Sequence, residues 1–75
     1  MGTIQRWNKV LTSKHWKMIQ DQSSPEAKAV YDFGSMYNKH ADPPTLALLQ
    51  GALEDFWVAN GGDIKIAKQI NAAGD

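Results

Sequence analysis

The side chains best suited to chemistry in this chain are two histidines, His15 and His40, and an adjacent pair of acids, Glu54 and Asp55. The histidines are far apart and the chain contains no cysteine, so the ligand spacing of a zinc site is absent. Neighbouring positions on a helix point about 100° apart, so the two acids do not share one substrate as general acid and base. We expect these residues to be structural or to face solvent.

The rest of the sequence contains no recognisable nucleophile or phosphate-binding loop. The serines lack the neighbouring base that activates a hydroxyl group, and Gly61-Gly62 does not belong to a G-x-x-x-x-G-K-[ST] pattern. A chain of 75 residues also has little room for both a core and an enclosed pocket. We therefore expect a protein that is not an enzyme, with no catalytic residue, no metal ligand and no cofactor.

The elements that position these residues are organised around one apolar stretch, residues 43 to 60. Asp42 is a suitable N-cap, and two prolines follow it in the first turn, where a missing N–H is tolerated. Asn60-Gly61-Gly62 supplies residues that tolerate a left-handed conformation and so end the helix. At helical spacing, large apolar side chains form one broad face: Leu46, Leu49, Leu53, Phe56 and Trp57. We expect neighbouring helices to enclose a helix this apolar.

Capping signals and periodicity predict further helices on both sides of this one. Ser24-Pro25-Glu26 begins a helix that runs to about Asn38. Asp63 caps a last helix whose inner face is formed by Ile66, Ala67, Ile70 and Ala73. Residues 3 to 21 carry an apolar stripe and form either one helix or two separated at Thr12-Ser13. The predicted fold class is all-α, a compact bundle of three to four short helices packed around residues 43–60.

Length and composition set the class of protein. Residues 1 to 75 are expected to form a single helical domain, near the size at which one core becomes marginal. The absence of cysteine removes disulfides and is compatible with the cytoplasm, which is the expected location. No run of about 18 apolar residues is present and the first residues lack the apolar segment of a signal peptide, so we expect no membrane association.

Charge is distributed unevenly, although the formal net charge is zero. Four basic residues precede the first acid: Arg6, Lys9, Lys14 and Lys17. If residues 3–21 form one helix, the basic side chains lie opposite the apolar stripe and Trp16 lies beside Lys9. Tyr31 points off the apolar stripe of its own helix, and Trp, Tyr and Arg are enriched at binding hot spots. The candidate partner-binding residues are therefore Arg6, Lys9, Trp16, Lys17 and Tyr31.

The C-terminal half resembles the first two helices of a Fis-type helix-turn-helix. The residues that carry the resemblance are Leu49, Ala52-Leu53-Glu54, Gly61-Gly62-Asp63-Ile64 and Ala67-Lys68-Gln69-Ile70-Asn71. In that family a recognition helix follows and enters the major groove of DNA. The present sequence ends at Asp75, so the resemblance implies two packed helices joined by a glycine turn.

Together these observations predict a small protein-binding module, a regulator, inhibitor or assembly subunit that acts by occupying a partner protein's surface. The partner is another protein or a second copy of the chain. The alternative is a nucleic-acid-binding helical domain in which the basic N-terminal helix contacts phosphates and Trp16 stacks on a base. Zero net charge favours the first interpretation.

Overall fold

The computed structural model describes residues 2 to 72, most of which belong to five helices. These are α1 (Thr3–Val10), α2 (Ser13–Asp21), α3 (Pro25–Lys39), α4 (Pro43–Ala59) and α5 (Ile64–Ala72). The described residues contain no strand, which confirms the all-α fold class. The predicted number of three to four helices is too low, because residues 3–21 form two helices.

The break between α1 and α2 is made by a reciprocal pair of hydrogen bonds. Leu11 and Thr12 both have extended backbone conformations. The Thr12 hydroxyl accepts from the His15 backbone N–H at 3.4 Å, and His15 Nδ1 accepts from the Thr12 N–H at 3.1 Å. This capping box satisfies free N–H groups at the start of α2, so the chain changes direction instead of continuing α1.

The predicted starts of the three later helices are confirmed. Ser24 Oγ accepts from the Ala27 N–H at 3.1 Å, and Asp42 Oδ1 accepts from the Thr45 N–H at 2.9 Å. Asp63 Oδ1 accepts from the Lys65 N–H at 2.9 Å. Hydrogen bonds from the side chain and backbone of Thr45 lower the pKa of Asp42 below its ordinary value, because they favour the ionised carboxylate.

Helix α4 ends in a Schellman motif at the predicted glycines. The Gly62 N–H donates to the Trp57 carbonyl at 2.8 Å, and the Gly61 N–H donates to the Val58 carbonyl at 3.0 Å. Gly61 has a φ of 87°, in the left-handed region that glycine adopts without a steric penalty. The motif reverses the chain, so α5 returns along α4.

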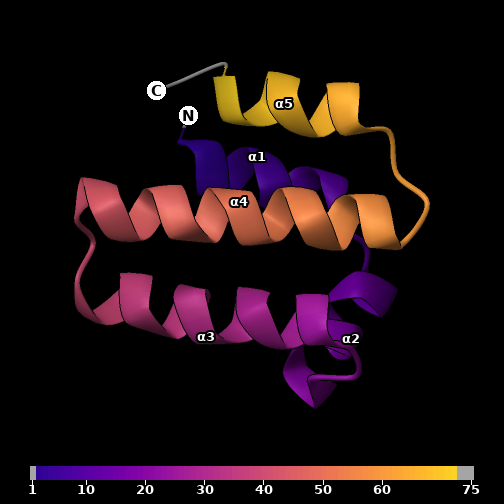
Figure 1. Cartoon of the computed structure of the whole chain (residues 1–75), viewed down its shortest axis with the longest axis horizontal. Helices are drawn as coiled ribbons and strands as arrows, with labels where there is room; N and C mark the ends of the chain where they lie inside the picture. The colour runs from indigo at the N-terminus through magenta and orange to yellow at the C-terminus, as the bar shows by residue number, and fades with distance from the viewer. Residues whose placement is uncertain (1, 73–75) are drawn as a thin grey trace.

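In the packed molecule, α4 lies between α3 and α5 (Figure 1), while α1 packs against α5 and α2 packs against α3. The fold is flat, with extents of 27 × 27 × 17 Å. Trp7 and Phe56 are the largest side chains with no exposed surface, and Leu53 is 2% exposed. None of the described helices has the length and hydrophobicity that crossing a membrane requires.

The expectation that neighbours enclose α4 is correct for one face and wrong for the other. Leu49, Leu53 and Phe56 are buried, but the opposite side is exposed along a stripe formed by Ala47, Leu48, Gly51, Asp55 and Val58. Leu48 is 48% exposed and Val58 is 45% exposed. The four remaining helices pack on the face that carries the larger apolar side chains, and none is left to cover the other face.

Helix α5 shows a similar difference. Ala67 and Ile70 are buried as predicted, whereas Ile66 is 43% exposed and its assignment to the inner face is wrong. Helix α5 packs against α4 and α1 only, and Ile66 points about 100° away from Ala67. Ala73 lies outside the described residues.

Candidate functional site

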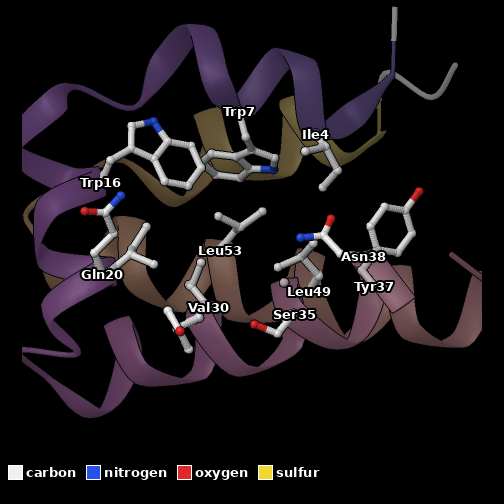
Figure 2. Close-up of a pocket in the computed structure, with 13 residues that line it drawn as sticks. Ile4, Trp7, Trp16, Gln20, Val30, Ser35, Tyr37, Asn38, Leu49 and Leu53 are labelled. Carbon is white, nitrogen blue, oxygen red and sulfur yellow. The ribbon is translucent and has the colours of Figure 1, made fainter. Parts of the chain in front are cut away.

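An open cleft lies between α1 and α3, with α4 beneath it and α2 at one end (Figure 2). Among the described residues, no Cα atoms of α1 and α3 lie within 8 Å of each other. The space between them has a volume of about 310 Å³. We call it the aromatic cleft, and its lining residues are Ile4, Trp7, Trp16, Ile19, Gln20, Val30, Tyr31, Gly34, Ser35, Tyr37, Asn38, Leu49 and Leu53.

The aromatic cleft has a closed apolar base and a partly exposed rim. The residues of the base are buried, with exposed fractions of 5% or less: Trp7, Ile19, Val30, Leu49 and Leu53. Trp16 and Tyr37 in the rim are half-buried, and Tyr31 is 43% exposed. Figure 2 shows Ile4, Trp7 and Trp16 along one wall, Val30 and Ser35 along the other, and Leu49 and Leu53 between them. An apolar base below a partly wet aromatic rim is typical of a binding site.

Charge is absent from the lining of the aromatic cleft. None of its residues carries a formal charge at neutral pH. Its polar side chains are all neutral: Gln20, Ser35, Asn38, two tyrosines and two tryptophans. A charged group that entered would lose hydration without gaining an ionic partner. The lining therefore favours an uncharged, largely apolar ligand.

Gly34, on α3, has no side chain and therefore leaves space in the cleft. Glycine in the middle of a helix costs about 0.5–1 kcal/mol relative to alanine. A Cβ atom built on Gly34 would meet only Leu49 Cδ1, at 4.0 Å, which is ordinary van der Waals contact. Gly34 does not have a positive φ either. Neither packing nor backbone geometry inside the chain requires glycine here, so its structural effect is the space that it leaves in the cleft.

The structure brings together two of the five predicted partner-binding residues. Trp16 from α2 and Tyr31 from α3 both line the aromatic cleft. Arg6 is half-buried, while Lys9 and Lys17 are exposed, and these three are not part of the lining. The expected position of Trp16 beside Lys9 was conditional on one continuous helix. That condition is not met, because the helix breaks before Thr12, and Trp16 packs against the core.

Sequence reasoning selected Tyr31 on α3 but missed the other residues of α3 that line the cleft, among them Gly34, Ser35 and Asn38. Gly34 and Ser35 are adjacent poor helix formers in the middle of a predicted helix, and together with Tyr31 and Asn38 they follow the spacing of one helical face. That combination was the available signal. The wall of the cleft that α1 forms has no comparable signal in the sequence, because the position of α1 opposite α3 depends on tertiary packing.

His15 packs among aromatic side chains. His15 is half-buried, and its ring lies 5.7 Å from that of Phe56 and 6.0 Å from that of Trp57, between centroids. Within residues 2 to 72, no three His, Cys, Asp or Glu side chains are grouped in a way that could hold a metal ion. His15 thus has a structural role, as a capping residue and as an aromatic contact between α2 and α4.

Other large apolar side chains are exposed on α4 and α5: Leu48, Val58, Ile64 and Ile66. Two of them, Val58 and Ile64, line a shallow depression together with Ala59, Asp55 and Glu26. The carboxylates of Asp55 and Glu26 distinguish this depression from the aromatic cleft, whose lining is uncharged.

No family model matches the chain, and comparisons with curated proteins and with solved structures gave no significant match. The two helices that resemble a Fis-type helix-turn-helix, α4 and α5, do pack together and are joined by the glycine turn at residues 60–63.

Proposed function

We propose that the protein is a small, non-enzymatic protein-binding module that receives part of a partner protein in the aromatic cleft. The observation that carries the proposal is Gly34, a residue that lowers helix stability and leaves an uncharged cleft above a buried apolar base. Departures from local stability rules of this kind are expected at functional sites. A module that binds in this way can act as a regulator, an inhibitor or an assembly subunit. The absence of cysteine agrees with a reducing compartment, and the cytoplasm is the proposed location.

Self-association has less support than binding of a different protein. The exposed surface of the chain is 4748 Å². A compact monomer of 8.3 kDa is expected to expose about 4,600 Å². The chain thus exposes about as much surface as a protein that folds alone, with no large excess for an obligate second copy to bury.

Nucleic-acid binding is also less well supported by the geometry. Lys9 and Lys17 are exposed, but the Trp16 ring that would stack on a base faces the uncharged cleft. Neither lysine is among the residues that line that cleft. Binding that weakens steeply between about 50 and 200 mM salt would identify this alternative.

The proposal is tested by filling the cleft and measuring which proteins remain bound. The wild-type chain and the variant Gly34→Leu are immobilised, and proteins captured from lysate of the source organism are quantified by mass spectrometry at low and moderate salt. We expect specific partners to be retained by the wild type and lost from Gly34→Leu, because leucine occupies the space above Leu49.

A matched control is available at the second mid-helix glycine with no packing constraint. Gly51 lies on the exposed side of α4, and a Cβ atom there would meet nothing within 4 Å. Gly51→Leu introduces the same side chain on the opposite face of α4 and should retain the partners. Capture that is unchanged in Gly34→Leu and lost in Gly51→Leu would reject the cleft and assign binding to the outer face of α4.

A further inference from the structure

We propose that the aromatic cleft holds the partner through one uncharged aromatic side chain, a tryptophan or phenylalanine that inserts above Leu49 and Leu53. This inference rests on the proposed function and adds to it the chemistry of the inserted group. Three properties of the cleft carry it: its volume, its lack of charge and the rings in its rim.

The volume of the aromatic cleft is sufficient for one ring system. An apolar cavity of about 150 Å³ is sufficient to bind benzene, and the cleft provides about 310 Å³. A single indole or phenyl group is therefore accommodated.

The lack of charge selects among ring systems. No lining residue carries a formal charge, so an anionic or cationic substituent would be desolvated without a counter-ion. The rim still provides hydrogen-bonding groups on Gln20, Ser35 and Asn38. A neutral ring with one N–H donor, such as indole, is suited to an apolar base with this polar edge.

The rim supplies rings from two helices. Trp16 projects from α2, and Tyr31 and Tyr37 project from α3. Aromatic rings associate most favourably in edge-to-face or offset geometry, with centroids about 4.5–7 Å apart. The protein already uses this geometry in its core, where the Trp7 and Trp57 rings lie 6.0 Å apart at 69°. An inserted ring can form the same kind of contact with Trp16.

The site is tested with 3-methylindole, the neutral analogue of a tryptophan side chain, titrated into the ¹⁵N-labelled full chain. We expect saturable shifts of the Trp16 indole N–H and of backbone amides in residues 31–38. The Trp57 indole N–H is an internal reference, because it donates to the Asp63 carbonyl at 3.0 Å and is not part of the cleft. Shifts of Trp57 without Trp16 would overturn the proposal.

Charge selectivity is measured with two analogues that keep the ring and change only its substituent. Tryptamine is a cation and indole-3-acetate is an anion at neutral pH. We expect both to bind roughly tenfold more weakly than 3-methylindole, because the cleft offers no counter-ion. Equal affinity of the three compounds, or preference for a charged one, would overturn the inference.

Two variants locate the bound ring. Gly34→Leu should abolish the Trp16 shift, and the matched variant Gly51→Leu should bind 3-methylindole as the wild type does. Circular dichroism establishes that both are folded. If Gly34→Leu is unfolded, Ser35→Phe fills the cleft from an exposed position of α3 and serves the same purpose. Undiminished binding by a folded, cleft-filled variant would overturn the proposal.

The outcomes separate this inference from the proposed function. If partners are lost from Gly34→Leu but 3-methylindole neither binds nor displaces them, the function stands and the aromatic anchor is rejected. If 3-methylindole binds in the cleft but capture of every protein is independent of Gly34→Leu, the proposed function is rejected, and with it the role of the ring as a partner's anchor.

Discussion

The indole nitrogen of Trp7 donates a hydrogen bond to Asn71 Oδ1 at 2.8 Å, joining residues 64 positions apart. Asn71 Nδ2 in turn donates to the Gln50 carbonyl at 3.4 Å. One amide side chain on α5 thus contacts α1 and α4, and Trp7 itself has no exposed surface. The first bond holds α1 against α5, and the second holds α5 against α4. Ile4, on α1, lines the aromatic cleft.

Replacing Asn71 by alanine should destabilise the protein by about 1–3 kcal/mol, because the buried indole N–H of Trp7 loses its acceptor. Urea unfolding followed by circular dichroism measures the change in free energy of unfolding. Gln69→Ala, at an exposed position of the same helix, is the control and should change stability little. A change in Asn71→Ala no larger than in the control would show that the bond contributes nothing.

Alanine at either mid-helix glycine should leave the fold intact and raise its stability. Gly34→Ala and Gly51→Ala are each expected to increase the free energy of unfolding by about 0.5–1 kcal/mol, since neither Cβ atom meets an obstacle. Thermal and urea unfolding measure this directly. A loss of stability in Gly34→Ala would mean that glycine is needed for packing against α4, and the functional argument from Gly34 would fail.

Gly62→Ala should be destabilising, in contrast to those two changes. A Cβ atom at this position would overlap the indole ring of Trp57, which packs over the turn and donates to the Asp63 carbonyl. We expect a loss of about 1–3 kcal/mol as the ring moves away. In a Trp57→Leu background, Gly62→Ala should cause little loss of stability. A double-mutant cycle measures this difference. An equal cost in both backgrounds would assign the effect to the backbone.

Acid should weaken the start of α4. The pKa of Asp42 is lowered in the folded protein, so its ionised form contributes stability above the pKa of the unfolded chain. That contribution is lost as the pH falls through the folded-state value. Asp42→Asn retains a capping side chain without a titrating group, so its stability should decline less between neutral pH and about pH 2. If the free energy of unfolding, measured with urea, falls equally with pH in the two proteins, ionisation of Asp42 does not contribute to stability.

Local signals in the sequence were sufficient to place most helix boundaries. Ser24, Asp42 and Asp63 each cap the helix that follows, and Gly61 adopts the left-handed conformation that ends α4. These features depend on hydrogen bonds within a few residues, and for that reason they can be recognised in a linear pattern. The break at Thr12 was left open because its capping box uses a histidine in place of the usual Glu or Gln.

The candidate site could be predicted only in part. Trp16 and Tyr31 were selected by residue type, and both line the cleft, but the basic residues chosen with them do not. The difference arises at two extended residues, Leu11 and Thr12, which separate α2 from α1, and Trp16 packs against the core. Periodicity assigns faces within one helix and carries no information about the angle between two helices.

The sequence by itself thus determined the helical class, the caps of three helices and the burial of Leu49, Leu53 and Phe56 on α4, because these follow from periodicity and short-range hydrogen bonding. Tertiary structure alone decided that one side of α4 stays exposed and that α1 and α3 stand apart above the other side. Contacts such as the one between Trp7 and Asn71 set those positions. They join residues distant in the chain, so the energy that fixes the cleft cannot be read from any single segment.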